Sequence, residues 1–363
     1  MKIADMHCDT IEQIWYSRLR GEPLCLSDTE GSSRELHIDL KKLVKGDYTL
    51  QNFAMFVNLS CPKDFDGRKE SITEKWSLEE KEHFLDPWYQ LQEMIKVYHE
   101  EIALNRDRIG EVRTWADYEK NQAEGRLSAV LTVEEGAVLQ GDISRLPRLY
   151  DEGVRMMTLT WNYYNELGCP NEPLEGYKED YTKYFAFVPR NDNGLTPKGF
   201  EALECMESLG IIPDVSHLSD AGFYDVARTV KGPFVASHSN ARALAGCNRN
   251  LTDDMIRTIA EHGGVIGLNF CPAFLDPQDR EDKCRCTCEI LARHARHIMN
   301  VGGREVIGLG TDFDGIGHEN LEMQDASGMQ MLPEYLLAHG FSLDETEAIL
   351  SKNVLRLYKE ALS

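Results

Sequence analysis

The stretch E-V-I-G-L-G-T-D-F-D-G, residues 305–315, holds the pattern on which the fold depends. A short run of apolar and glycine residues, without alternating polar ones, is followed at once by Asp312 and Asp314. Such a run is typical of a strand that is buried on both faces, as strands of parallel sheets are. The stretch therefore predicts a buried strand with two carboxylates at its carboxyl end.

Seven further runs of the same kind occur along the chain, and amphipathic helical stretches separate them. The eight predicted strands cover residues 2–5, 49–59, 128–133, 155–160, 210–216, 233–238, 264–270 and 305–311. This alternation favours an α/β fold of the (β/α)8 TIM-like barrel type, and an open doubly wound sheet is the alternative.

Residues 60–125 are expected to form a helical insertion between the second and third strands of this barrel. Residues 342–362 are expected to form helices that close it. Because the chain shows no internal repeat, low-complexity segment or Gly/Ser linker, residues 1–363 are expected to form a single domain.

The composition narrows the classes of partner. The formal net charge of −22, from 39 basic and 61 acidic residues, would repel nucleic acid and anionic membrane surfaces. No stretch approaches the roughly 18 to 20 consecutive apolar residues of a membrane-spanning helix. The N-terminus also lacks the basic and apolar regions of a signal peptide. We therefore expect a cytoplasmic protein that acts on small molecules.

The ten cysteines include no C-x-x-C pair, which fits free thiols in a reducing compartment. Cys284, Cys286 and Cys288 are the one cluster among them. Three thiols at a spacing of two fit no common zinc site. We expect them to be small packed residues that lead into the following helix.

Residues able to bind metal follow five of the eight predicted strands, and in a barrel these ends meet at one rim. They are His7 and Asp9, Glu134 and Glu135, His217, His238, and Asp312 with Asp314. Such a mixed nitrogen and oxygen set suits zinc or another first-row divalent ion. Five ligands are too many for one open catalytic zinc site. They suit two ions that share a carboxylate and activate a common water.

Several motifs in order and spacing resemble the membrane (renal) dipeptidase family, the M19 metallopeptidases. They are DMHCDT, VEEG, GVRMMTLTWN, GLTPKGFEALECMESLGIIPDVSHLSD, PFVASHSNARAL, NRNL and IGLGTDFDG. The resemblance covers nearly the whole chain. It implies a binuclear zinc dipeptidase that uses metal-activated water, with dipeptides, including L-D dipeptides, as substrates and a homodimer as the assembly.

Carried over by position, the resemblance implies that His7 and Asp9 bind one zinc and that His217 and His238 bind the other. Glu135 is expected to be the catalytic bridging carboxylate, because the family has a glycine after its glutamate. Glu134 is the alternative.

The resemblance also assigns residues to the substrate. Arg249 matches the arginine that binds the substrate carboxylate, for which a planar guanidinium is well suited. Asp312 matches a catalytic acid that orients the water and passes its proton to the leaving amine.

The chain departs from the family pattern after the fourth predicted strand. Where many relatives read TLTH, this chain reads TLTWN, and Trp161 replaces a histidine thought to hold the substrate or stabilise the oxyanion. Asn162, Asn165 or a water could supply the lost hydrogen bond, and Trp161 could instead form an apolar wall of the pocket. Trp161 and Asn162 are therefore both expected to contact substrate.

Two other readings of the sequence stay open at this point. One is a barrel amidohydrolase that acts on a cyclic amide or a lactone, although such enzymes typically open with H-x-H and not with the His7 and Asp9 pair. The other is a catalytically weak relative that binds peptides without turnover. Retention of Arg249 and Asp312 argues against the second.

Overall fold

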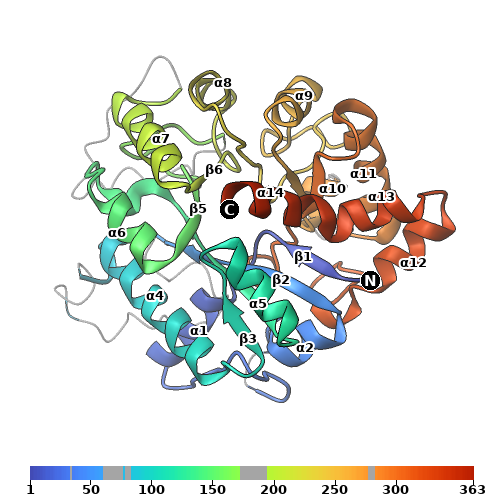
Figure 1. Ribbon diagram of the computed structural model, residues 1–363, viewed down its shortest axis with the longest axis horizontal. Coiled ribbons are helices and arrows are strands. Elements are labelled where there is room, and N and C mark those ends of the chain that lie inside the picture. The colour runs from blue at the N-terminus through green and yellow to red at the C-terminus, as the bar shows by residue number, and fades with distance from the viewer. Residues whose placement is uncertain (33–34, 60–76, 78–82, 172–193, 277–282) are drawn as a thin grey trace.

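The computed structural model describes residues 1–32, 35–59, 77, 83–171, 194–276 and 283–363. A curled parallel sheet lies at the centre and helices surround it (Figure 1). The strands are β1 Ile3–Asp5, β2 Tyr48–Phe56, β3 Ile109–Glu111, β4 Leu127–Glu134, β5 Val154–Thr158, β6 Ile212–Asp214, β7 Ile266–Leu268 and β8 Ile307–Leu309.

The sheet closes into a barrel. Its strands pair in the order β6-β5-β4-β2-β1-β8-β7. Two isolated parallel bridges, Asp214 with Val235 and Ala236 with Ile266, join its two ends. The predicted strand at 233–238 therefore exists as this short bridging segment, and the expected TIM-like barrel is confirmed.

Helices follow the strands and cover the outside of the barrel (Figure 1). They are α1 Thr10–Leu19, α2 Leu40–Lys45, α4 Pro87–Leu104, α5 Trp115–Ala123, α6 Arg145–Glu152, α7 Pro197–Leu209, α8 Asp220–Thr229, α9 Asp253–Glu261, α10 Pro272–Leu275, α11 Cys288–Gly302, α12 Met331–Ala338, α13 Leu343–Glu347 and α14 Asn353–Ala361. Helix α7 shows why they begin where they do. The Thr196 side chain accepts a hydrogen bond from the Gly199 amide, and Pro197 occupies the first turn.

Helix α14 fills the end of the barrel that lies opposite the carboxyl ends of the strands. Its residues Val354, Leu357 and Tyr358 are buried in one cluster with inward-facing side chains of the strands. These strand residues are Ala4, Leu50, Val130, Met156, Ile212 and Val235. The Tyr358 hydroxyl also donates a hydrogen bond to Asn52 Oδ1 at 2.9 Å. The expectation that the C-terminal helices close the barrel is confirmed.

The insertion between the second and third predicted strands is not purely helical. It contains α4 and α5 as expected, but also β3, which pairs in parallel with the start of β4. This three-residue strand depends on the free edge of β4 and not on any apolar run of its own. Residues 60–76 and 78–82 of the insertion lie outside the described residues.

The described cysteines are free thiols. Cys284, Cys286 and Cys288 are all buried, and the last two belong to the main apolar core. The expectation that they are packing residues is confirmed.

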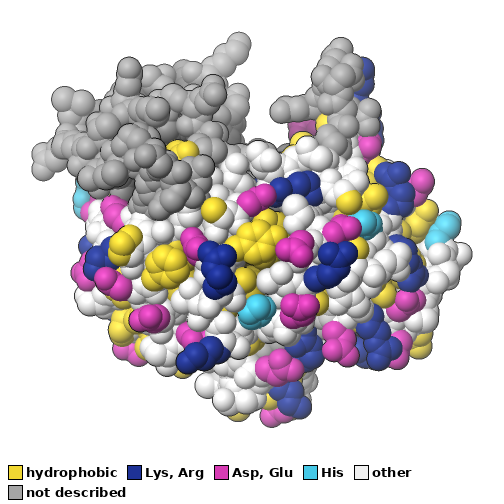
Figure 2. Space-filling view, turned by 90° about the horizontal axis from the view of Figure 1, so that it is seen from above, with side chains coloured by type: hydrophobic (Ala, Val, Ile, Leu, Met, Phe, Trp, Pro, Cys, Tyr) yellow, Lys and Arg dark blue, Asp and Glu magenta, His cyan; other side chains and the backbone are white. Residues whose placement is uncertain are grey.

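On the face shown in Figure 2, acidic and basic side chains are interspersed with apolar ones. None of the helices in the described ranges combines the length and apolar character needed to cross a bilayer.

Candidate metal centre

The carboxyl ends of the strands converge on a pocket of about 320 Å³. Glu134 is the last residue of β4, and His7, His217 and Asp312 follow β1, β6 and β8. His238 follows the short segment that closes the barrel. Asp9, Glu134, His217, His238 and Asp312 line this pocket, and His7 has a ligand atom within 4.8 Å of those of Asp9 and Glu134. The residues that the sequence placed at separate strand ends therefore meet, as parallel strands in a barrel require.

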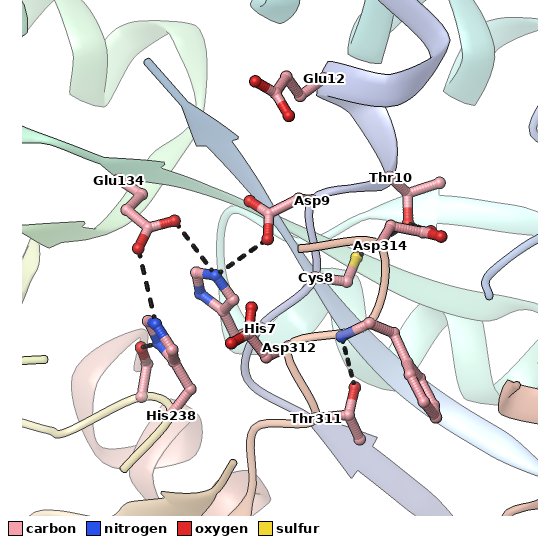
Figure 3. Close-up of polar contacts among 12 residues, drawn as sticks. His7, Cys8, Asp9, Thr10, Glu12, Glu134, His238, Thr311, Asp312 and Asp314 are labelled. Atoms are coloured by element: carbon pink, nitrogen blue, oxygen red, sulfur yellow. Dashed lines mark hydrogen bonds and ion pairs between the residues drawn. The ribbon is translucent and has the colours of Figure 1, made fainter. Parts of the chain in front are cut away.

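Glu134 contacts several members of this cluster, and dashed lines join it to His7 and to His238 in Figure 3. Its Oε2 is 3.3 Å from His7 Nε2. Its Oε1 is 3.3 Å from His217 Nε2 and 3.6 Å from His238 Nε2. Asp9 Oδ2 lies 3.5 Å from His7 Nε2. Three sets of three potential ligands occur among the described residues. Two of them contain Glu134, one with His7 and Asp9 and one with His217 and His238, and the third consists of His7, His238 and Asp312.

The hydrogen bonds behind His238 determine which of its ring nitrogens carries the proton. Ser237 Oγ donates to Asp214 Oδ2 at 2.6 Å, so at the 2.7 Å contact with His238 it accepts from Nδ1–H. His238 Nε2 is then an unprotonated acceptor that faces Glu134.

His217 is arranged in the same way. Its Nδ1 lies 2.9 Å from Asn162 Oδ1, which can only accept a hydrogen bond. His217 Nε2 is therefore unprotonated as well, and it lies 3.2 Å from His238 Nε2. Two nitrogen lone pairs and a carboxylate oxygen thus converge with no proton between them, which is a favourable arrangement only around a cation.

Electrostatics support the same conclusion. Burial lowers the pKa of His238 well below its usual value and lowers that of His217 to about 4. Burial raises the pKa of Asp9 to about 7, although nearby His7 opposes this shift. Burial also works to raise the pKa of Glu134, but His7 and His217 outweigh it and hold this pKa far below its usual value. For His217, His238 and Glu134 these are the protonation states that a divalent ion requires. Burial works to lower the pKa of His7, but the charges of Glu134 and Asp9 outweigh it and raise this pKa well above its usual value.

Unsatisfied polar atoms show that the site fits a metal. His7 Nε2 and Asp9 Oδ1 are buried and make no hydrogen bond. Buried polar atoms without partners are rare in folded proteins and call for an explanation. The available donors are nitrogen and oxygen, as first-row divalent ions prefer.

Glu135 is not part of this cluster, contrary to the expectation from the sequence. Its backbone turns at φ 98°, and its side chain accepts hydrogen bonds from the amides of Ala137 and Trp161 at 2.7 and 2.8 Å. Glu134, the alternative, occupies the position between the histidines. Neighbouring residues at a strand end point in opposite directions, so only one of the pair can face the barrel mouth.

Arg249 lies beside the pocket with its guanidinium buried. Its side chain is only 2% exposed, and Nη1 donates to Ser239 Oγ at 2.7 Å. Its Nε and Nη2 atoms have no hydrogen-bond partner. Burial lowers the pKa of Arg249, while Asp312 and Glu134 act in the opposite direction. Phe274, which lines the pocket, lies 5.6 Å below the guanidinium.

Asp312 lies at the rim with a left-handed backbone, φ 63°. Its Oδ2 accepts a hydrogen bond from Asn269 Nδ2 at 3.0 Å. Burial raises the pKa of Asp312 to about 6, partly against the effect of His7. A carboxyl group that titrates near neutral pH can both accept and donate a proton.

Trp161 and Asn162, the two expected substrate contacts, both line the pocket. The Trp161 ring packs against Phe56 with ring centroids 4.8 Å apart. Asn162 bonds His217 as described, so it also orients a candidate ligand. Asn165 does not line the pocket, because its side chain bonds Glu135 and the Leu159 carbonyl instead.

The sequence reasoning missed the residues that support the histidines. Asp214 accepts hydrogen bonds from Thr158 Oγ1, from Ser237 Oγ and from the amides of Ser216 and Ser237. The sequence did contain a feature that could have pointed to Asp214, since this residue lies in the same D-V-S-H motif as His217. Its role depends on strand pairings that no local pattern reveals.

Comparison with known proteins is consistent with this geometry. The family model described as membrane dipeptidase (peptidase family M19) matches residues 1–363. An uncharacterized protein in the pqqA 5′ region of Klebsiella pneumoniae is 32% identical over 274 residues, which is 76% of this chain and 97% of that protein. An uncharacterized dipeptidase of Schizosaccharomyces pombe is 26% identical over 332 residues, 89% of this chain and 72% of that protein.

A solved structure shows the same fold. A metallopeptidase from Rhodobacter sphaeroides, liganded with a phosphinate mimic of the dipeptide L-Ala-D-Ala, has a TM-score of 0.81 and 24% identity. The match covers 100% of this chain and 99% of that one. With the family match over its full length, the chain belongs to peptidase family M19, the membrane dipeptidase family, and is a metal-dependent dipeptidase.

Proposed function

We propose that this dipeptidase holds two first-row divalent ions, zinc foremost, with Glu134 as the ligand that both ions share. The observation that carries the proposal is the orientation of Glu134. Its Oε2 faces the set with His7, and its Oε1 faces the unprotonated Nε2 atoms of His217 and His238. Two such ions, when bound, would lower the pKa of a water molecule and polarise the peptide carbonyl.

The charges around the pocket suit both ends of a dipeptide. Arg249 offers two unpaired N–H groups to the terminal carboxylate, and a charge-assisted bond of this kind is strong in a buried setting. Asp9 and Glu12 line the pocket and provide negative charge for the terminal ammonium. Asp312 lines the same pocket, where it can pass a proton to the leaving amine. In a longer peptide the two charged termini lie farther apart, so these groups could not bind both of them at once.

The substrate range of this proposal includes L-D dipeptides. The structurally similar Rhodobacter sphaeroides metallopeptidase binds a mimic of L-Ala-D-Ala, and this supports the extension.

A panel assay tests the proposal. Purified protein reconstituted with zinc is expected to bind two equivalents and to hydrolyse L-L and L-D dipeptides. Tripeptides and N-acetylated dipeptides are expected to be poor substrates. Hydrolysis of a cyclic amide or a lactone, with no cleavage of any dipeptide, would instead favour the amidohydrolase alternative.

Substituting one histidine should remove one ion. His217→Ala is expected to reduce bound zinc from two equivalents to about one and to abolish dipeptide hydrolysis, because a three-ligand set becomes a two-ligand set. Metal analysis after gel filtration, together with kcat on a dipeptide, measures both effects. His262→Ala is a suitable control, because His262 bonds only backbone carbonyls of Thr258 and Ala227. Two equivalents and full turnover in His217→Ala would refute the ligand assignment.

Trp161 is expected to act as an apolar wall. Trp161→His exchanges this wall for a smaller side chain that can donate a hydrogen bond into the pocket. We expect kcat/KM to fall about tenfold or more for dipeptides with large apolar side chains and to change little for Gly-Gly, because one lost apolar contact is worth roughly that factor. Equal changes for both substrates would show that Trp161 does not contact substrate side chains.

A further inference from the structure

Glu135 occupies a backbone conformation that L-residues rarely adopt. Its dihedral angles are φ 98° and ψ 106°, and its side chain is fully buried. A conformation of this kind is intrinsically unfavourable, and it persists only where the surrounding structure enforces it. Glycine would adopt it without the steric cost that a Cβ brings. The glutamate must therefore be held by its side-chain contacts.

These contacts reach across to the segment that follows β5. Glu135 Oε2 accepts the Trp161 amide at 2.8 Å, and Oε1 accepts from the Asn165 side chain. Oε1 also accepts the Ala137 amide at 2.7 Å within its own turn. Two of the three donors thus belong to the segment 159–168, which we call the β5 loop.

Asn165 connects these hydrogen bonds of Glu135 to the rest of the β5 loop. Its Nδ2 also donates to the Leu159 carbonyl at 2.9 Å, and its Oδ1 accepts the amides of Leu167 and Gly168 at 2.8 and 3.1 Å. Both ends of the β5 loop are therefore tied to Asn165, and Asn165 is tied to Glu135.

The β5 loop carries Asn162, the residue that holds His217. Asn162 follows Trp161 directly, and its Oδ1 accepts from His217 Nδ1 at 2.9 Å. This bond fixes the tautomer that leaves His217 Nε2 free for a metal. A displacement of the Trp161 amide would move Asn162 with it, because the two share a peptide bond.

We propose that Glu135 is a positioning residue: it fixes the β5 loop so that Asn162 presents His217 to the metal at Glu134. The inference rests on the proposed function, since it assigns His217 to a metal ion. In this arrangement the two adjacent glutamates have separate tasks. Glu134 binds the ions, and Glu135 holds in place the loop whose Asn162 orients the ligand His217.

A double-mutant cycle between Glu135→Gly and Asn162→Ala tests the proposal. Loss of an outer partner of a metal ligand typically costs about 10- to 100-fold in metal affinity or activity. Each single variant is expected to weaken one of two zinc equivalents by this factor, as measured by competition with a chelator, and to lower kcat more than it raises KM. Both substitutions act through the same hydrogen bond to His217. The double variant should therefore bind zinc no more weakly than the single variant with the lower zinc affinity.

Two further variants separate positioning from folding. Gln140→Gly removes the other left-handed side chain of the same turn, φ 50°, and is expected to leave zinc affinity and kcat unchanged. Glu135→Gln keeps the size of the side chain but replaces one accepting oxygen by an NH2 group, which can only donate. It should therefore show the same loss of zinc affinity and kcat, and it keeps the test decisive even if Glu135→Gly unfolds.

Additive effects in the cycle would overturn the proposal. So would unchanged zinc affinity in Glu135→Gln accompanied only by a lower melting temperature, because that is the result of a purely structural role. The chelator competition does not depend on turnover. If wild-type protein binds zinc but cleaves no dipeptide, the proposed function fails, while the competition still decides the role of Glu135.

Discussion

Glu134→Gln is expected to remove both metal ions and to lower kcat/KM for dipeptides by at least about 10³-fold. The two oxygens of Glu134 face different sets of ligands, so the loss of its charge affects both sets at once. Ions that polarise a carbonyl contribute several kcal/mol to transition-state stabilisation, which corresponds to this factor or more. Metal analysis and steady-state kinetics on the same preparation measure the two effects.

Glu135→Gln is the matched control for the metal content at saturating zinc, since it makes the same chemical change one residue along. At saturating zinc it should retain both equivalents, because the Glu135 carboxylate faces amide donors and not the histidines. If Glu134→Gln kept two ions and wild-type turnover while Glu135→Gln lost them, the carboxylate shared by the ions would be Glu135.

Arg249→Met should raise KM for dipeptides by about 30-fold or more, with a smaller effect on kcat. The substitution removes a buried cation whose loss typically costs roughly 2–5 kcal/mol when its charged partner stays in place. The contact with the substrate carboxylate exists before and during the reaction, so most of the loss appears in KM. Initial-rate kinetics over a wide range of dipeptide concentrations measure the split.

Dipeptide amides provide the control for Arg249. They lack the terminal carboxylate, so wild type and Arg249→Met should hydrolyse them with similar kcat/KM. A large difference between the two enzymes on the amide would show that Arg249 acts elsewhere. Arg249→Lys is expected to restore only part of the affinity, because an ammonium cannot make the two parallel bonds of a guanidinium.

Arg249→Met should also stabilise the substrate-free protein. In the wild type the guanidinium is 2% exposed, and its Nε and Nη2 are without partners. Burial of an incompletely paired charge costs free energy that a methionine of similar length would not incur. Urea unfolding of both proteins without substrate measures this difference, and a lower free energy of unfolding for Arg249→Met would contradict it.

The sequence predicted the barrel because most of its strands can be recognised from their own local sequence. Runs such as V-I-G-L are apolar without alternation, and each is followed by polar residues that the barrel gathers at one rim. The strand β3 was missed for the opposite reason. Ile109–Glu111 forms a strand only because β4 offers it an edge, and that edge depends on the tertiary structure.

The metal centre was predictable in outline but not in detail. Strand ends place His7, His217 and His238 near one another in any barrel of this order. The choice between Glu134 and Glu135 depends on the backbone of Glu135, which turns at φ 98°. Two adjacent glutamates give no sign in the sequence of which one makes this turn. The family pattern, in which glycine follows the glutamate, favoured Glu135, whereas the structure groups Glu134 with the histidines.

The way in which the barrel closes has a consequence for how the chain reaches its native state. β1 pairs with β8, and Asp5 accepts hydrogen bonds from Thr311, which is 306 residues away in sequence. Such distant pairings make folding slow, and α14 can occupy the barrel floor only after the strands have assembled. β1 can pair early in synthesis with β2, its other neighbour, but the 306 residues that separate Asp5 from Thr311 must be released before β1 can pair with β8. Nascent chains should depend on chaperones through this interval, and growth at low temperature should increase the soluble yield.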